Sequence, residues 1–325
     1  MLDRYQRAIT YLRVSVTDRC NLRCVYCMPP EGISLAASAE VLSFEEIARV
    51  VRVGAGLGIR RVRLTGGEPL VRRNLAELVR MLRAIEGLDE ISLTTNGLLL
   101  AGQAEALAAA GLRRVNISLD TLRPERFAEI TRGARLEEAR AGLEAALAAG
   151  LRPAKINAVL QSERGDGKGS EEDLRRFVEL AAGLGVEVRF IELMPFALNR
   201  DGFVPVSWVK EKLAALASLE PAAEGEGGGP AESFRLKGTE GRIGFIAAMT
   251  APFCERCNRL RLGATGRLRV CLFAEEGPDL RAALRTGGRD ADLEDLLRAA
   301  AAAKPASYPR DGGVGLAGTM CQVGG

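Results

Sequence analysis

The feature that most constrains the fold is a regular alternation, over residues 11–193, of short β-branched runs with longer segments rich in alanine, leucine, glutamate and arginine. Such runs are typical of buried strands, and the longer segments are typical of amphipathic helices. The predicted strands are residues 11–16, 60–65, 90–95, 114–118, 154–159 and 186–193. Parallel strands joined by helical crossovers form either an open doubly wound sheet or an incomplete barrel.

Two of the helices between these strands have clear end signals. Residues 43–55 open with Ser43, a typical N-cap, and acidic residues follow in the first turn. Residues 136–149 are followed by Gly150, which takes the left-handed conformation common after a helix at little cost.

Polar residues gather at or near the carboxyl ends of all the predicted strands. Parallel α/β folds build their active sites at this edge. Loops are exposed and therefore often polar, which could account for one or two of these segments but accounts less well for all of them. The segments are Cys20, Thr65-Gly-Gly-Glu-Pro69, Thr94-Thr-Asn-Gly97, Ser118-Leu-Asp120, Lys155 with Asn157, and Glu192-Leu-Met-Pro195.

The first of these segments carries Cys20, Cys24 and Cys27 in a C-x3-C-x2-C spacing, in a chain without histidine. Three thiolates can hold three corners of a 4Fe-4S cube, whereas a closed zinc site needs four ligands. The fourth iron is then open to a substrate or cofactor, which favours redox catalysis. The alternative is a zinc ribbon or three incidental core cysteines.

A second triplet consists of Cys254, Cys257 and Cys271. It again provides three thiolates, so it favours a second iron–sulfur cluster with an open iron. Zinc is the alternative, with Cys321 as a fourth ligand.

Several cations lie within predicted strands. Arg259 and Arg261 share one face if their segment is a strand, and paired guanidiniums suit an anionic substrate such as a phosphate. A solvated edge strand is the alternative. The charge of Lys155 in the fifth strand needs a partner. Either it meets a phosphate of a ligand, or the side chain extends to water at the edge of the sheet. The same two alternatives apply to Arg13 and Arg63.

The composition is typical of a globular enzyme and excludes enzymes that depend on histidine. The chain has 325 residues, 47% hydrophobic and 27% charged, which is typical of a globular enzyme. It lacks an apolar run of signal-peptide or membrane-helix length, so a cytoplasmic location is expected, where cysteines are metal ligands more often than disulfides. Absence of histidine excludes Ser-His-Asp hydrolases and zincins.

Residues 221–230 are rich in glycine, proline and glutamate and predict a long connection. The chain is therefore predicted to consist of residues 1–220 and a C-terminal extension, residues 221–325. Within the extension, the pattern predicts strands over residues 243–247, 259–262 and 268–271, and a helix over residues 293–303.

Taken together, these motifs resemble the GTP 3',8-cyclase family within the radical S-adenosylmethionine (radical SAM) superfamily. The resemblance rests on the segments LRVSVTDRCNLRCVYCMP, RLTGGEPL, TTNG, FIELMP, FCERCNRLRL and the final GG. These segments extend over nearly the whole chain. They imply an incomplete (β/α)6 TIM-type barrel with a C-terminal extension that carries a second iron–sulfur cluster.

The resemblance also implies site residues. A 4Fe-4S cluster that binds S-adenosylmethionine falls on Cys20, Cys24 and Cys27, and a second 4Fe-4S cluster falls on Cys254, Cys257 and Cys271. S-adenosylmethionine contacts fall on Tyr26, Gly67, Ser118 and Met194. GTP contacts fall on Arg13, Arg63, Thr94, Lys155, Arg259, Leu260 and Arg261. The terminal Gly324 and Gly325 are implied to enter the pocket and assist catalysis.

In the implied reaction, reductive cleavage of S-adenosylmethionine gives a 5'-deoxyadenosyl radical that abstracts H3' of GTP. The C3' radical adds to C8, and reduction gives (8S)-3',8-cyclo-7,8-dihydroguanosine 5'-triphosphate, the first step of molybdenum cofactor biosynthesis. Expected partners are GTP, a reductant such as flavodoxin or ferredoxin, cyclic pyranopterin monophosphate synthase for the product, and a second copy of the chain, but no membrane or nucleic-acid polymer. The alternatives are a peptide-modifying radical SAM enzyme and a nonenzymatic iron–sulfur or zinc sensor.

Overall fold

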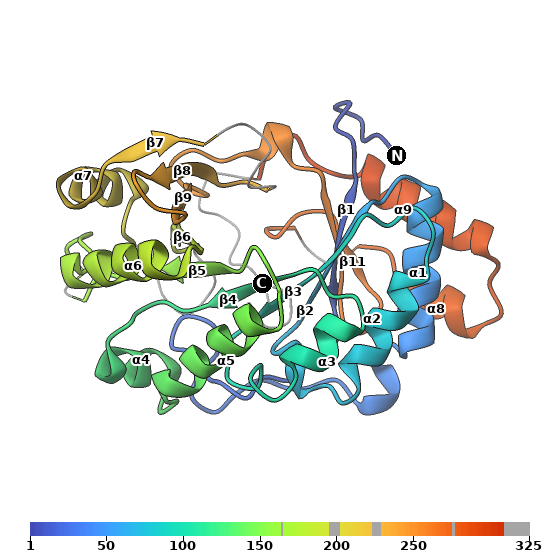
Figure 1. The fold of residues 1–325 in the computed structure, drawn as a ribbon. Helices are drawn as coiled ribbons and strands as arrows, with labels where there is room; N and C mark the ends of the chain where they lie inside the picture. Colours follow the sequence, from blue (N-terminus) through green and yellow to red (C-terminus); the bar gives the residue numbers. More distant parts are fainter. Residues whose placement is uncertain (164, 195–201, 223–228, 275–276, 309–325) are drawn as a thin grey trace.

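A computed structural model describes residues 1–163, 165–194, 202–222, 229–274 and 277–308. Its centre is one sheet of eleven strands in the order β11-β10-β1-β2-β3-β4-β5-β6-β9-β8-β7 (Figure 1). The strands are β1 (Tyr11–Ser15), β2 (Arg61–Thr65), β3 (Glu90–Thr95), β4 (Arg114–Ser118), β5 (Lys155–Val159), β6 (Glu187–Ile191), β7 (Leu219–Pro221), β8 (Glu232–Leu236), β9 (Arg242–Ile246), β10 (Arg259–Leu262) and β11 (Leu268–Arg269).

Strands β1 to β6 form the parallel centre of this sheet, each paired with the next along the chain. Among the described residues the sheet ends at β11 and β7, so it is an open, incomplete barrel, and the predicted fold class is confirmed. The sixth strand is shorter than predicted. It ends at Ile191, and the carboxylate of the next residue, Glu192, accepts from Val206 N and Met249 N outside the strand.

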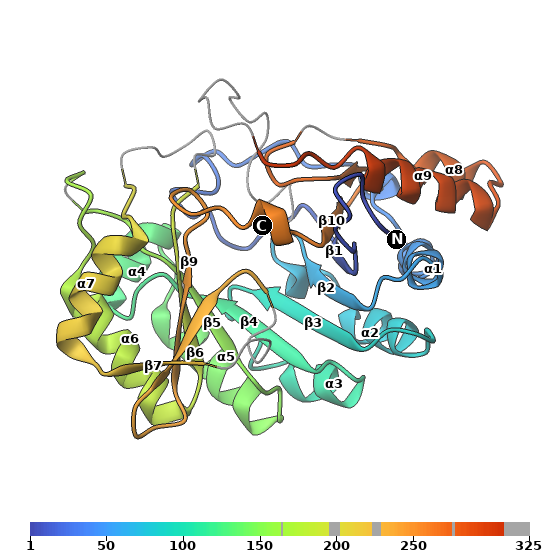
Figure 2. The same cartoon turned by 90° about the horizontal axis from the view of Figure 1, so that it is seen from above.

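Helices cover the outer side of the curved sheet (Figure 1, Figure 2). The α-helices are α1 (Phe44–Gly56), α2 (Leu75–Arg83), α3 (Ala104–Ala109), α4 (Pro124–Thr131), α5 (Leu136–Ala148), α6 (Glu171–Leu184), α7 (Val206–Leu216), α8 (Leu280–Arg285) and α9 (Asp290–Ala302). Short 3-10 turns are η1 (Ser38–Glu40), η2 (Pro69–Val71) and η3 (Cys254–Arg256). The predicted cap of α1 is confirmed, because Ser43 Oγ accepts from Glu46 N at 3.1 Å and Glu46 Oε2 accepts from Ser43 N at 2.7 Å.

The C-terminal extension adds strands to both edges of the parallel centre. Strand β9 pairs in parallel with β6, and β10 pairs in parallel with β1, with Tyr11 opposite Arg259. An exposed parallel edge leaves backbone donors and acceptors unpaired, and these two strands satisfy them. The extension therefore shares one sheet with the rest of the chain, and the division after residue 220 stays a prediction. Residues 223–228 of the expected connection lie outside the described residues.

The helices of the described residues include none that is both long enough and apolar enough to cross a membrane.

Candidate functional site

A cavity of about 320 Å³ lies at the carboxyl ends of the parallel strands. Both cysteine triplets line it, the first from the loop after β1 and the second from η3 and the segment after β11. The predicted residues that line it are Cys20, Cys24, Cys27, Cys254, Cys257, Cys271, Tyr26, Gly67, Ser118, Met194, Arg13, Arg63, Thr94, Arg259 and Arg261. The fold thus brings together side chains that lie far apart in the sequence.

The first cysteine loop is tied to the sheet through Tyr26. Its hydroxyl donates to Asp120 Oδ2 at 2.7 Å, and Asp120 Oδ1 accepts from Val159 N at 2.9 Å. Burial raises the pKa of Asp120 to about 6, although both hydrogen bonds act in the opposite direction. Burial, together with the charges of Asp120 and Cys20, also raises the pKa of the Cys24 thiol. A bound cation would offset this effect, because it stabilises the thiolate.

The twin glycines after β2 pack against the segment that leads to Cys20. A Cβ on Gly66, whose φ is +149°, would lie 2.3 Å from Thr17 O. A Cβ on Gly67 would lie 2.3 Å from Arg19 O. No side chain fits at either place, so both glycines are needed for the close approach of the two loops, and Gly67 also lines the cavity.

Glu68 follows these glycines and was given no role by the sequence pattern. It is 1% exposed and accepts from Thr95 Oγ1 at 2.7 Å, Asn96 N at 2.7 Å and Leu70 N at 3.0 Å. Burial raises its pKa to about 7 despite these donors. The carboxyl group joins the loops after β2 and β3.

A row of arginines crosses three neighbouring strands. Arg13 on β1 pairs in register with Arg261 on β10 and with Arg63 on β2. Residues at paired positions share one face, and all three line the cavity. Burial and the neighbouring guanidiniums lower the pKa of Arg13, and burial lowers that of Arg261 to about 10. Among the described residues, the buried Arg13 Nε has no hydrogen-bond partner, which an anionic ligand would provide.

Lys155 makes a buried ion pair instead of lining the cavity. Its Nζ lies 2.7 Å from Glu187 Oε2, and Arg189 Nε lies 2.7 Å from Glu187 Oε1. Burial and the charge of Arg189 lower the pKa of Lys155 to about 7. Arg189 does line the cavity, and the sequence analysis missed it. It pairs in register with Asn157 on β5, and the sequence alone does not give this register.

The remaining predicted residues have different placements. Leu260 is fully buried, and the alternation along β10 turns its side chain away from the face of Arg259 and Arg261. Its contact with GTP stays a prediction. Gly324 and Gly325 lie outside the described residues.

Three further buried polar atoms belong to residues that line the cavity and have no hydrogen-bond partner within the described part of the chain. They are Thr94 Oγ1, Asn116 Oδ1 and Asn157 Oδ1. Since buried polar groups are nearly always satisfied, these atoms indicate a polar ligand. Asn116 was not predicted, although its position two residues before Ser118 places both on one face of β4.

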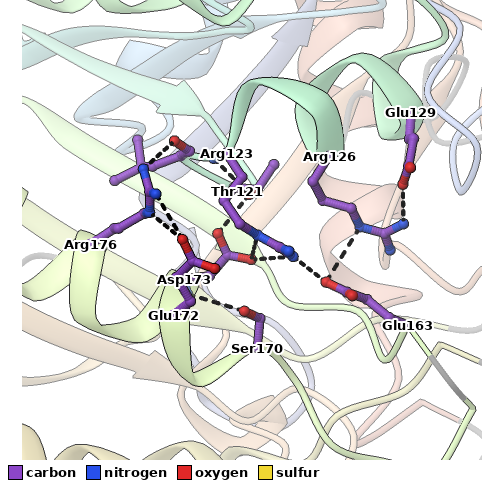
Figure 3. Close-up of polar contacts among 10 residues, drawn as sticks. Thr121, Arg123, Arg126, Glu129, Glu163, Ser170, Glu172, Asp173 and Arg176 are labelled. Carbon is purple, nitrogen blue, oxygen red and sulfur yellow. Dashed lines mark hydrogen bonds and ion pairs between the residues drawn. The ribbon is translucent and has the colours of Figure 1, made fainter.

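An ion-pair network outside the cavity holds the loop after Asp120 (Figure 3). Thr121 Oγ1 donates to Asp173 Oδ1 at 2.6 Å, and Arg123 Nε and Nη2 lie 3.3 and 3.2 Å from Asp173 Oδ2. Arg123 also pairs with Glu163. Asp173 belongs to the first turn of α6, so the network connects the ends of β4 and β5 to that helix.

The second triplet has a positive environment. Burial acts to raise the pKa of Cys257, but the charges of Arg259 and Lys304 lower it to about 7. The six cysteines form no disulfide with one another.

Comparisons with known proteins agree with this geometry. Residues 14–166 match the Radical SAM superfamily model, and residues 186–309 match the Molybdenum Cofactor Synthesis C model. The chain is 48% identical over 330 residues to the GTP 3',8-cyclase of Pelotomaculum thermopropionicum, and the match covers 100% of both chains. It is 46% identical over 328 residues to the GTP 3',8-cyclase of Moorella thermoacetica, again over 100% of both.

Among solved structures, Streptococcus suis SuiB bound to S-adenosylmethionine is similar in fold. The TM-score is 0.59 at 15% identity, over 90% of this chain and 68% of SuiB. The full-length relatives and both family models establish the family. The chain belongs to the GTP 3',8-cyclase family of the radical SAM superfamily.

Proposed function

We propose that the protein cyclises GTP to (8S)-3',8-cyclo-7,8-dihydroguanosine 5'-triphosphate, the first step of molybdenum cofactor biosynthesis. The observation that carries the proposal is a single cavity lined by two cysteine triplets and by the arginine row. The first triplet suits activation of a cofactor, and the arginines suit a triphosphate. The full-length GTP 3',8-cyclase relatives support the same substrate.

Membership of the radical SAM superfamily supports S-adenosylmethionine and an iron–sulfur cluster as cofactors. We propose two 4Fe-4S clusters, one on each triplet. In the described part of the chain, no three cysteine, aspartate or glutamate side chains converge where they could share one metal ion. A four-iron cube takes each thiolate on a different iron, so its ligands stand further apart. When bound, the clusters and S-adenosylmethionine supply the reducing electron and the radical that starts the reaction.

The residues of the chain bind and orient the two small molecules. Tyr26, Gly67, Ser118 and Met194 are proposed to contact S-adenosylmethionine. Arg13, Arg63, Thr94, Lys155, Arg259, Leu260 and Arg261 are proposed to contact GTP. Arg189 is added because it lines the cavity beside Asn157. Holding both molecules in one cavity keeps the intended C–H bond nearest to the radical.

Several finer points of the proposal depend on the family resemblance. Gly324 and Gly325, which have no side chain, would enter the cavity and assist the radical step. Flavodoxin or ferredoxin would supply electrons, and cyclic pyranopterin monophosphate synthase would receive the product. A homodimer, a cytoplasmic location and the division into residues 1–220 and 221–325 belong to the same proposal.

Anaerobic incubation with S-adenosylmethionine, dithionite and each nucleoside triphosphate in turn tests the proposal. We expect 5'-deoxyadenosine together with a cyclised product only when GTP is present. Formation of 5'-deoxyadenosine without a GTP-dependent product would refute the substrate assignment. Binding of stoichiometric zinc without iron after reconstitution would refute the proposal that the protein is an iron–sulfur enzyme.

A double variant tests the role of the arginines. R259A/R261A should weaken GTP binding and leave the iron content of the first triplet unchanged. R267A is the matched control, because Arg267 is a half-exposed arginine of the same hairpin that does not line the cavity. Equal losses of iron and of GTP binding in the double variant would show that these arginines are structural.

A further inference from the structure

A buried lysine that no motif identified lies against the second cysteine triplet. Lys304 is 2% exposed and lines the cavity. Its Nζ donates to Arg259 O at 3.0 Å and to Val270 O at 2.7 Å. Arg259 lies two residues after Cys257, and Val270 immediately precedes Cys271. One ammonium group therefore joins the two backbone segments that carry the second and third cysteines.

The charge of Lys304 is not neutralised within the protein as described. In the ranges that the structure covers, its Nζ makes no ion pair with a carboxylate, and its acceptors are the two neutral backbone carbonyls and the side chain of Cys257. Burying an unpaired ammonium is costly, so such a group is retained where it meets negative charge from another source. An iron–sulfur cluster on thiolates is such a source, and its potential responds to net charge and hydrogen bonding around it.

A second buried cation nearby gives a useful contrast. Arg7 donates from Nη1 to Cys254 O at 2.7 Å and to Ala306 O at 3.0 Å, so it holds the first cysteine of the triplet to the segment after Lys304. However, its Nε lies 2.5 Å from Asp3 Oδ2, and this carboxylate is fully buried. Arg7 therefore joins these segments while Asp3 neutralises its charge, whereas Lys304 leaves a positive charge beside Cys257 and Cys271.

We propose that Lys304 is a positioning residue for the second iron–sulfur cluster: it holds the segments of Cys257 and Cys271 together and makes the cluster easier to reduce. The inference rests on the second cluster of the proposed function. A lysine near the end of α9 also interacts favourably with the helix dipole. That structural role alone would change the stability of the chain without changing the potential of a cluster.

The test uses the full chain with Cys20, Cys24 and Cys27 replaced by alanine, so that only the second cluster is observed. After anaerobic reconstitution, iron is counted and the midpoint potential is measured by titration followed with electron paramagnetic resonance. K304M removes the charge and keeps the length of the side chain, whereas K304R keeps the charge. K237M is the control, since Lys237 is exposed in the turn between β8 and β9, at the other end of the sheet.

We expect K304M to lower the midpoint potential by about 59 mV or more, which is a tenfold change in the one-electron equilibrium. K304R and K237M should stay near the value of the background chain. If K304M loses the cluster while K304R retains it, the proposal is supported; equal loss in both overturns it. An unchanged potential in K304M also overturns it, whereas absence of any cluster in the background chain overturns the proposed second cluster itself.

Discussion

Replacement of Glu192 by alanine should destabilise the protein strongly, because this one buried carboxylate holds two other segments to the end of β6. Glu192 is 1% exposed and follows β6. Its oxygens accept from Val206 N at 3.0 Å, Met249 N at 2.8 Å, Thr250 N at 2.9 Å and Thr250 Oγ1 at 2.6 Å. These donors belong to the start of α7 and to the loop that leads to Cys254.

The magnitude follows from the donors that would be left without a partner. A buried N–H group without an acceptor costs about 1–3 kcal/mol, and Val206 N is in that class. The N–H groups of Met249 and Thr250 are partly buried, so each counts at about 1 kcal/mol, the lower end of that range. The Thr250 hydroxyl can rotate to water. The sum is a loss of about 3–5 kcal/mol, a large share of the ~5–15 kcal/mol that stabilises a typical protein.

Urea unfolding of the reduced, metal-free protein measures this loss. Circular dichroism follows the whole chain, and the single tryptophan, Trp208, reports on α7. The control is E232A, because Glu232 is an exposed glutamate paired with Lys210 at 2.6 Å and should contribute no more than about 1 kcal/mol. If the free energy of unfolding of E192A lies within about 1 kcal/mol of the wild-type value, or is no lower than that of E232A, Glu192 does not hold these segments together.

The same variant should affect the two triplets unequally. Met249 and Thr250 lie on the segment that leads to Cys254, and the first cysteine loop has no contact with Glu192 among its hydrogen bonds in the described residues. E192A should therefore lose iron from the second triplet and retain it on the first. Equal loss from both would indicate general unfolding.

Three further predictions concern Glu68 and Gly67 in the cavity wall and the ion-pair network of Asp173 outside it. A carboxyl group whose folded pKa is raised contributes stability at low pH that is lost as pH rises toward that pKa; for Glu68, a rise from 4.5 to about 7 corresponds to about 3 kcal/mol. The difference in free energy of unfolding between wild type and E68Q, measured at pH 4 and at pH 8, should change by this amount. An equal difference at both pH values would contradict the prediction. D173N should lower the free energy of unfolding by about 2 kcal/mol. E172Q, which removes an exposed ion pair of the same helix, should change it by less than about 0.5 kcal/mol. Similar changes in the melting temperature of both variants would show that the Asp173 network does not stabilise the protein. G67A should displace the first cysteine loop and lose its iron, whereas G102A, where a Cβ meets nothing within 4 Å, should keep it; equal iron in both would show that the loop adapts.

The parallel centre was predictable because its signals are local. Each strand is a short apolar run, and its neighbour in the sheet is the next strand in the chain. The capping pair of Ser43 and Glu46 likewise lies within one turn. The pairing of β9 with β6 and of β10 with β1 was not predicted, since it depends on which edges are left unpaired after the centre has formed. No local pattern carries that information.

The candidate site divides in the same way. The cysteines were found from their spacing, although only the first triplet lies on one short loop, since Cys271 follows β11. Gly67 was implied by the family resemblance. Arg7 and Lys304 were not predicted, and Glu192 was noted only as a polar residue at the end of its strand. The roles of all three depend on backbone groups that no side-chain pattern identifies. Arg189 was missed for a different reason. It resembles any charged residue in a strand until the register with Asn157 places it in the cavity wall.

The arginine row shows how closely the extension and the parallel centre depend on each other. Arg13 and Arg63 come from β1 and β2, but Arg261 joins them only because β10 pairs with β1 in one particular register. A slip of one residue would turn Leu260 toward the cavity and Arg261 away from it. The buried faces of Leu260 and Leu262 oppose this slip, because it would expose both leucines to the polar cavity. Apolar packing on one face of β10 therefore selects the register that completes the cationic wall on the other.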